Sequence, residues 1–187
     1  MKIAFDAKRA FLNGSGLGNY SRSTLDLLKK LQPEIEMVLC TPKANSKFSF
    51  EALKTSTTIS PKSFIWKKFH AFWRSFRLKN ALANSGVQIF HGLSAELPSG
   101  LQQKKIKTIV TVHDLIYVRF PQWYGFFDRH LYNLKYRKAA QTADLVIAIS
   151  EQTKNDLVDF YKISPEKIRV VYQGCNPIFL QEISDET

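Results

Sequence analysis

Residues 2–6 read Lys-Ile-Ala-Phe-Asp, and residues 13–20 read Asn-Gly-Ser-Gly-Leu-Gly-Asn-Tyr. The first segment is a short apolar run that ends in a carboxylate, which is typical of a buried strand. From residue 20 to residue 31, leucines recur at spacings that keep one side of a helix apolar. These segments predict a strand, a glycine-rich loop and a helix in succession.

The glycine-rich loop is a candidate phosphate-binding site. Backbone N–H groups at a helix N-terminus carry partial positive charge, and glycines let a phosphate approach them because they have no Cβ atom. Gly16, Leu17 and Gly18 are the residues that we expect to contact such a group. The alternative is that these glycines serve only to turn the chain from strand to helix.

The same loop disfavours NAD binding. The fingerprint G-x-G-x-x-G requires a third glycine at the position of Asn19, and an acidic residue about 20 residues further on. Cys40 and Thr41 end the second predicted strand in place of that acidic residue.

Strand and helix patterns alternate along the rest of the chain. Further strands are predicted at residues 36–40, 57–60, 86–92, 107–114, 144–149 and 167–172, and helices at residues 64–84, 121–142 and 150–161. Residues 43–56 are mixed and polar, which favours a loop. Because no tight hairpin signal occurs, the pattern predicts an α/β fold with a doubly wound parallel sheet of about seven strands. We expect residues 1–173 to form one domain and residues 174–187 to begin a connector.

The composition indicates where the protein is located and which kinds of site are excluded. With 44% apolar and 23% charged residues, the chain has the composition of an ordinary globular protein. It contains neither a signal-peptide pattern nor an apolar run long enough to span a membrane, so a cytoplasmic location is expected. Cys40 and Cys175 are predicted to be reduced, and the four histidines lack the spacing of a metal site.

The net charge of +11 is concentrated in one segment. No Asp or Glu occurs between Ala52 and Ala95, and the predicted helix at residues 64–84 combines aromatic residues with cations. Such a helix either lies on an anionic membrane surface or packs its aromatic residues into the core. Nucleic-acid binding is disfavoured because no recognised binding module accompanies it. The candidate membrane-surface residues are Trp66, Lys67, Lys68, Trp73, Arg74 and Arg77.

Polar residues follow several of the predicted strands. Ligands of open parallel sheets bind beyond the carboxyl ends of the strands. Asp6, His91, His113 and Asp114 all fall at that edge, together with the glycine-rich loop. This edge is the predicted functional site.

Four motifs in register resemble a known family. They are Gly16-Leu-Gly-Asn-Tyr20, Thr111-Val-His-Asp-Leu-Ile116, Ala143-Asp-Leu-Val-Ile-Ala-Ile-Ser-Glu151 and Lys167-Ile-Arg-Val-Val-Tyr-Gln-Gly174. Their order and spacing look like the N-terminal half of a family 4 glycosyltransferase of the GT-B fold, with two Rossmann-like domains facing each other across a cleft. Within that family, the chain looks most like the bacterial mannosyltransferases of polysaccharide assembly.

The resemblance implies a retaining transferase that uses a nucleotide-diphosphate sugar without a bound metal or other cofactor. GDP-mannose is the favoured donor, with a UDP-hexose as the alternative. This half would bind the acceptor, a growing surface glycan or a lipid-linked saccharide. The resemblance is also compatible with a peripheral location on the inner face of the membrane. The donor-binding C-terminal domain is expected to be absent from this chain, so the isolated domain is expected to be inactive.

The resemblance also assigns roles to residues. Gly16–Gly18 would approach the donor diphosphate, and His113 would contact the transferred sugar, the alternative being a histidine that merely caps the sheet. Asp114 would either orient His113 or bond to backbone. Ser150 is expected to be a helix N-cap first and a ligand contact second. Asp6 and Arg9 either pair with each other or touch the acceptor, and His91 is a further candidate contact.

The chain departs from the family pattern at two places. Asn19 stands where related sequences often carry a basic residue, which affects the acceptor or phosphate contacts. Gln173-Gly-Cys-Asn176 replaces the commoner Asn-Gly-Val-Asp, a change that we expect to affect little beyond the linker. The alternative function from another class is a non-catalytic basic α/β module that binds anionic lipid or glycan.

Overall fold

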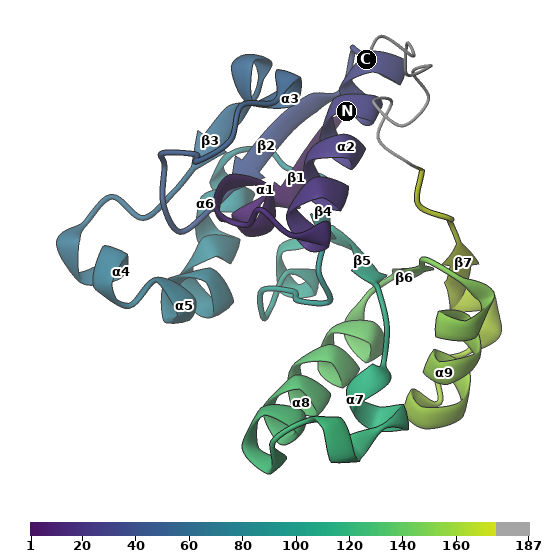
Figure 1. Ribbon diagram of the computed structural model, residues 1–187. Helices are drawn as coiled ribbons and strands as arrows, with labels where there is room; N and C mark the ends of the chain where they lie inside the picture. Colours follow the sequence, from purple (N-terminus) through teal and green to yellow (C-terminus); the bar gives the residue numbers. More distant parts are fainter. Residues whose placement is uncertain (175–187) are drawn as a thin grey trace, which may run out of the picture.

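The computed structural model describes residues 1–174, and in them one parallel sheet organises the chain (Figure 1). The strand order is β3-β2-β1-β4-β5-β6-β7, and all neighbouring strands are parallel. This arrangement confirms the predicted doubly wound fold. The strands are β1 (Lys2–Asp6), β2 (Glu36–Cys40), β3 (Thr57–Ile59), β4 (Ile89–Gly92), β5 (Lys107–Val112), β6 (Leu145–Ala148) and β7 (Ile168–Val170).

Helices connect the strands. The α-helices are α1 (Lys8–Leu12), α2 (Gly16–Leu31), α3 (Glu51–Thr55), α4 (Phe64–Lys68), α5 (His70–Phe72), α6 (Leu78–Asn84), α7 (Ile116–Arg119), α8 (Phe126–Thr142) and α9 (Glu151–Tyr161). A π-helical turn, η1 (Trp73–Arg77), joins α5 to α6. Short 3₁₀ turns lie at η2 (Gln102–Lys104), η3 (Pro121–Trp123) and η4 (Pro165–Lys167).

Successive residues of β1 point to opposite faces of the sheet and enter different parts of the core. Phe5 packs with Leu25 of α2 and with residues of α1 and α3. Ala4 packs instead with Phe90 and with Leu82 of α6. Both faces of the central strands are therefore covered, as their continuous apolar runs predicted. A third apolar cluster surrounds β5 and β6 and includes residues of α7, α8 and α9.

The predicted single helix over residues 64–84 is wrong. Phe69 leaves helical geometry (φ −99°, ψ 44°), which separates α4 from α5, and the π-helical turn follows. These breaks change the direction in which later side chains point. As a result Trp73 is buried, whereas Phe72 and Phe76 are 54% and 46% exposed. A regular helical period put all three aromatic residues on the same apolar face, whereas the structure buries only Trp73.

Two smaller predictions also need correction. Residues 43–56 are not a plain loop, because α3 forms within them, and α1 was not predicted. β5 ends at Val112, so His113 and Asp114 follow the strand instead of belonging to it. Cys40 is buried and reduced, whereas Cys175 lies outside the described residues.

Within residues 1–174, none of the helices has the length and apolar character needed to cross a bilayer.

Candidate functional site

The carboxyl ends of β1, β4 and β5 lie side by side in the sheet. β1 pairs with β2 on one side and with β4 on the other. The chain therefore builds the sheet outward from β1 in one direction through β3 and in the opposite direction from β4 onward. Such a topological switch point is where open α/β sheets bind ligands. The glycine-rich loop follows β1, and His113 follows β5.

Gly18 makes the close contact between α2 and the loop before it. A Cβ atom at this position would lie 1.8 Å from the carbonyl oxygen of Asn13, so only glycine fits here. A Cβ atom on Gly16 would meet nothing within 4 Å, because Gly16 is the exposed first residue of α2. The two glycines therefore have different roles: Gly18 packs the loop, and Gly16 leaves the helix terminus open.

The N-terminus of α2 is not neutralised by the chain itself. Ser15, which precedes the helix, makes no side-chain capping bond, and the first turn contains no acidic residue. The Ser15 hydroxyl instead donates to the Asn13 side chain at 2.6 Å. The positive end of the α2 dipole is therefore available to an anion.

Arg22 brings a guanidinium group to this loop, which sequence reasoning missed. Its Nη1 donates to the carbonyl oxygens of Ala10 and Asn13, at 3.0 and 2.9 Å. Its Nη2 donates to Oδ1 of Asn19 at 2.6 Å. Asn19 itself is exposed and carries no charge, so Arg22, one turn further along α2, places a cation next to it.

His113 is partly buried between four elements. Its Nε2 lies 3.0 Å from the carbonyl oxygen of Leu93, and its Nδ1 lies 3.0 Å from the amide nitrogen of Gln173. The ring meets the ring of Tyr20 from α2 at 89°, with centroids 4.7 Å apart. The backbone carbonyl of His113 accepts a hydrogen bond from the Thr153 hydroxyl at 2.9 Å.

These partners define the protonation of His113. A carbonyl oxygen only accepts, so Nε2 carries the hydrogen, and Nδ1 accepts from the Gln173 amide. Burial lowers the pKa of His113 below its ordinary value, and the Arg9 guanidinium adds to this effect. The bond to Leu93 and the Asp114 carboxylate oppose it. The imidazole is therefore neutral at pH 7.

His91 is a buried member of a second chain of hydrogen bonds. Its Nε2 lies 2.9 Å from the Thr111 hydroxyl, which lies 3.2 Å from the Tyr20 hydroxyl. Burial lowers the pKa of His91 to about 4. With 6% of its surface exposed, His91 supports Tyr20 through Thr111 and does not itself line the open site. Tyr20 and Thr111 were not predicted as site residues.

Asp6 pairs with Arg74 and not with Arg9. Arg74 Nη1 lies 3.7 Å from the Asp6 carboxylate, and the Arg74 guanidinium also forms an ion pair with Glu96. Asp6 is 3% exposed and accepts from the Lys8 amide as well. Arg9 stays half-buried on α1 and close enough to influence His113.

Asp114 and Ser150 have local roles. The Asp114 carboxylate accepts from the Ile116 amide at 3.1 Å, so of the two predicted roles the backbone bond is the one formed. Ser150 accepts from the Thr153 amide at 3.1 Å and is the N-cap of α9, as predicted. Through Thr153, this cap also fixes the backbone of His113.

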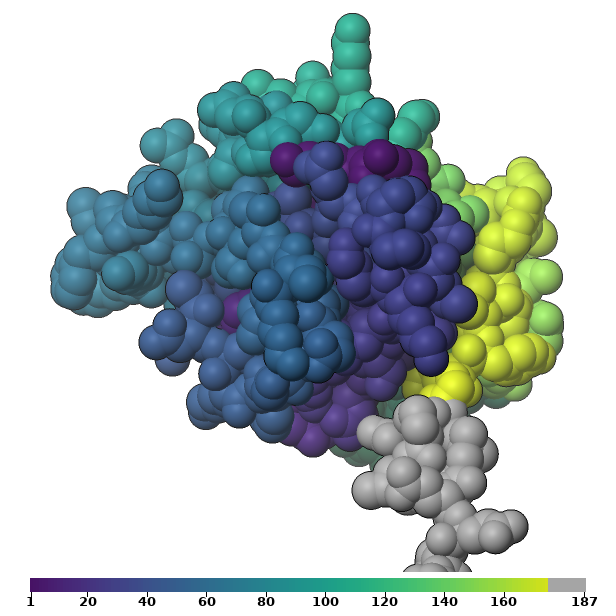
Figure 2. Space-filling view, turned by 90° about the horizontal axis from the view of Figure 1, so that it is seen from above, coloured from purple at the N-terminus to yellow at the C-terminus, as the bar shows by residue number. Residues whose placement is uncertain are grey.

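The predicted membrane-surface residues divide into two groups. Trp73 is buried in the core and Arg74 is held at the rim by its two carboxylates, so neither belongs to an exposed surface. Lys67, Lys68 and Arg77 are exposed, and Trp66 is half-buried beneath the Arg77 guanidinium. This segment projects from one side of the molecule (Figures 1 and 2). Its exposed apolar residues are Phe64, Ile65, Phe69, Phe72 and Phe76.

A basic groove lies between η1 and α8. It has a volume of about 370 Å³, and its charged lining consists of Arg74, Glu96, Lys135 and Lys138. Glu96 is engaged by Arg74, so the lysines of α8 give the groove a positive charge. Burial lowers the pKa of Lys8, which follows β1, and the nearby charges of Arg74, Arg9 and Lys135 add to this effect.

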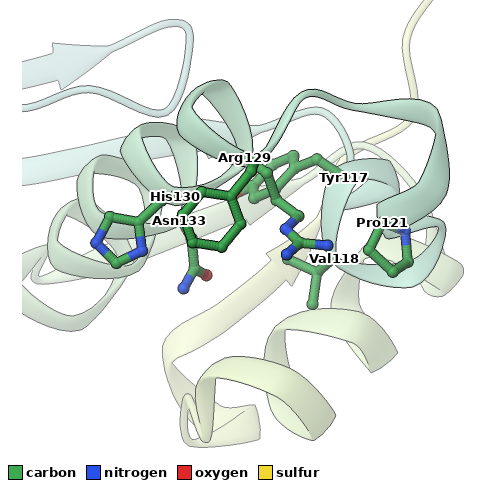
Figure 3. Close-up of a pocket in the computed structure, with 7 residues that line it drawn as sticks. Tyr117, Val118, Pro121, Arg129, His130 and Asn133 are labelled. Atoms are coloured by element: carbon green, nitrogen blue, oxygen red, sulfur yellow. The ribbon is translucent and has the colours of Figure 1, made fainter.

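A second hollow lies at the other end of α8. This cavity of about 320 Å³ is lined by residues of α7, η3 and α8 and contains none of the predicted site residues. In it, Arg129 points toward Val118 and Pro121, whereas His130 points away from them (Figure 3). Among residues 1–174, no group of His, Cys, Asp and Glu side chains is arranged to hold a metal ion.

Comparison with known proteins gives a consistent result. The sequence model described as Glycosyltransferase Family 4 matches residues 20–178. No curated protein sequence matches the chain. Among solved structures, the lipopolysaccharide outer core galactosyltransferase WaaB in its apo form has a TM-score of 0.54 and 18% identity, over 94% of this chain and 46% of its own.

Two further solved structures have the same fold. Anabaena HepE, in complex with UDP and glucose, has a TM-score of 0.56 and 12% identity, over 98% of this chain and 47% of its own. A glycosyltransferase from Rickettsia africae ESF-5 has a TM-score of 0.54 and 17% identity, over 99% of this chain and 46% of its own. The chain thus spans about half the length of the solved structures that it matches.

Proposed function

The chain belongs to glycosyltransferase family 4, and we propose that it is the acceptor-binding half of a retaining glycosyltransferase. The observation that carries the proposal is the contact between Tyr20 and His113. Tyr20 lies in the second turn of α2, two residues after Gly18. Its contact with His113 therefore brings the N-terminus of α2 and the imidazole together at the carboxyl ends of the strands. An anion-binding terminus beside a neutral imidazole suits a sugar that carries a diphosphate.

The α2 terminus is the proposed contact for the donor diphosphate. Gly16 leaves its backbone accessible, and the uncapped first turn supplies N–H donors and the positive end of the helix dipole. A leaving diphosphate gains negative charge as the bond between the anomeric carbon and the phosphate oxygen breaks, and fixed donors stabilise that charge without reorganisation. We propose that this contact takes the place of a bound metal on this side of the cleft.

His113 is proposed to orient the transferred sugar. Its Nε2–H is already held by the Leu93 carbonyl, so Nδ1 is the atom that remains for a ligand. As a neutral acceptor, Nδ1 would receive a hydrogen bond from a sugar hydroxyl in place of the Gln173 amide. We therefore propose for His113 a positioning contact with substrate and not the transfer of a proton.

The basic groove between η1 and α8 is the proposed acceptor site. Lys135 and Lys138 line the groove without an ion-pair partner among residues 1–174, and Arg74, which pairs with Asp6 at the end of β1, lines it as well. This charge favours an acceptor with phosphate or carboxylate groups, such as an anionic glycan or a lipid-linked saccharide. GDP-mannose is the donor that we favour, on the resemblance of the motifs to mannosyltransferases, with a UDP-hexose as the alternative.

The test uses the polypeptide joined to a nucleotide-binding half, since the chain spans 46% of WaaB. Sugar transfer and hydrolysis are measured with GDP-mannose and with UDP-glucose. His113→Ala is expected to lower turnover roughly 10²-fold because the hydroxyl contact is lost, whereas His130→Ala on α8 should change it less than about twofold. Full activity of His113→Ala, or no transfer from either donor, would contradict the proposal.

A second function is favoured by the projecting segment of residues 64–77. Its exposed aromatic residues are accompanied by Lys67, Lys68 and Arg77, and no acidic residue occurs between Ala52 and Ala95. Aromatic residues enter the interface of a bilayer, and each cation near an anionic surface contributes about 1 kcal/mol. We propose that this segment attaches the protein peripherally to anionic lipid.

Co-sedimentation with vesicles tests this attachment. Lys67→Glu with Lys68→Glu should weaken binding to vesicles that contain anionic lipid by at least roughly tenfold, at about 1 kcal/mol per charge changed. Lys104→Glu with Lys105→Glu removes the same charge at exposed positions at the end of η2, just before β5 and outside the projecting segment, and should have a smaller effect. Equal loss in both double variants would indicate a general charge effect and contradict a specific surface.

A further inference from the structure

We propose that Gln173 is a positioning residue that keeps Nδ1 of His113 unprotonated and so prepares it for the sugar hydroxyl. The catalytic part of this inference rests on the proposed function, whereas its structural part does not. Gln173 lies 60 positions from His113 in the sequence, follows β7 and is the last residue of the predicted domain.

The two ring nitrogens of His113 have partners of opposite kinds. The Leu93 carbonyl at 3.0 Å requires a hydrogen on Nε2, and the Gln173 amide at 3.0 Å offers a hydrogen to Nδ1. An imidazolium carries a hydrogen on both nitrogens, so its Nδ1–H would face the N–H of the amide, and the bond would persist only if the carboxamide turned its oxygen toward the ring. The two contacts as they stand fit the neutral ring with its hydrogen on Nε2.

The path of the chain brings Gln173 to this place. The Val171 amide donates to the Ala148 carbonyl at 2.9 Å, which keeps the chain beside β6 after β7 has ended. Thr153 at the start of α9 holds the backbone of His113 on the same side. Gln173, which follows β7, can thus reach the His113 ring, which follows β5, past the end of β6. We expect that an asparagine side chain, shorter by one methylene, would not span this distance.

The other groups that face the imidazole do not offer Nδ1 a hydrogen bond. Tyr20 presents its ring, Leu93 bonds to Nε2, and Asp114 and Arg9 act only through their charges. Among residues 1–174, Gln173 is the residue whose side chain forms a hydrogen bond with Nδ1.

The direct test measures the imidazole of His113 in the chain of 187 residues by NMR of ¹⁵N-labelled histidine. We expect the signals of an Nε2–H tautomer and a pKa below 6.5. Gln173→Ala and Gln173→Asn should raise the measured pKa of His113 by roughly 0.5, since a donor to the neutral form is lost. The signals of buried His91 should not move.

Gln122→Ala is the matched control, because Gln122 is exposed and has no side-chain partner among the described residues. Equal pKa and tautomer in Gln173→Ala and Gln122→Ala would overturn the inference, even if both variants fold normally. In the polypeptide joined to its nucleotide-binding half, Gln173→Ala should shift the acid limb of the turnover profile upward by a similar amount. An NMR shift without any sugar transfer would leave the positioning role intact and reject only the proposed function.

Discussion

The rings of Tyr20 and His113 meet at right angles, with their centroids 4.7 Å apart, and this contact joins α2 to the end of β5. The Tyr20 hydroxyl also lies 3.2 Å from the Thr111 hydroxyl. Tyr20→Phe keeps the ring and removes the hydrogen bond, so unfolding free energy should fall by about 1 kcal/mol. Tyr20→Ala removes both contacts and should cost about 3 kcal/mol.

Urea denaturation of the two variants measures these differences. Tyr132→Phe is the control, since its hydroxyl has no hydrogen bond among the described residues, and its effect should stay within about 0.5 kcal/mol. If Tyr20→Phe were as stable as Tyr132→Phe, the bond to Thr111 would not contribute to the fold.

The two glycines at the start of α2 should respond differently to the same substitution. In Gly18→Ala the added methyl group would lie 1.8 Å from the Asn13 carbonyl oxygen, so α1 and α2 must move apart. We expect a loss of at least about 2 kcal/mol. Gly16→Ala meets no atom within 4 Å and should leave stability unchanged or slightly higher, because alanine favours the helix.

Thermal unfolding followed by circular dichroism distinguishes the two glycine variants. An equal midpoint for Gly16→Ala and Gly18→Ala would show that the loop adjusts freely, contrary to the close contact at Gly18.

Arg74 should be more important for stability than the neighbouring Arg77. Loss of Arg74 leaves the Asp6 carboxylate, which is 3% exposed, without its counter-ion, and we expect Arg74→Ala to cost about 3 kcal/mol. Arg77 is exposed and lies 5.2 Å from the centroid of the Trp66 ring, so Arg77→Ala should cost less than about 1 kcal/mol. Chemical denaturation at pH 7 measures both, and the reverse order would mean that Asp6 is stable without Arg74.

Stability should decrease as the pH falls below neutral. Burial lowers the pKa of His91 to about 4, so the unfolded chain takes up a proton near pH 6.5 while the folded chain does not. The stabilisation is complete above pH 6.5 and is lost progressively between pH 6.5 and 4, by up to about 3 kcal/mol. The pKa of His113 is also lowered by burial, which adds to the same trend.

Denaturation at pH 7.5 and at pH 5.0 tests this dependence. His91→Gln should be less stable than the wild type at pH 7.5 and should show a smaller loss of stability at pH 5.0, because one titrating group is gone. If the pH dependence of stability were unchanged in His91→Gln, titratable groups other than His91 would be its cause.

The strands were predictable because runs such as residues 107–112 are rich in β-branched residues and continuous. The site was predictable only in part. The carboxyl ends of the strands lie at the same edge of any parallel sheet, so the sequence alone predicted that His113 and the glycine-rich loop belong to the site. The contacts of Tyr20, Thr111, Arg22 and Gln173 depend instead on how α2 and the chain after β7 cross the sheet, and no local pattern records that.

The projecting segment of residues 64–77 shows a second way in which prediction from the sequence failed. Phe69 departs from helical geometry, and a π-helical turn begins at Trp73, although the sequence of residues 64–84 has a regular helical period. Neither break involves Pro or Gly, the residues that usually mark one. The burial of Trp73 against the sheet accompanies both breaks, and tertiary packing of this kind overrides local propensity.

The outermost strands of the sheet, β3 and β7, have three residues each. Edge strands this short offer few free backbone groups to a neighbouring chain. A concentrated preparation of the protein should therefore resist ordered aggregation through these edges, and any self-association should involve the projecting aromatic residues instead.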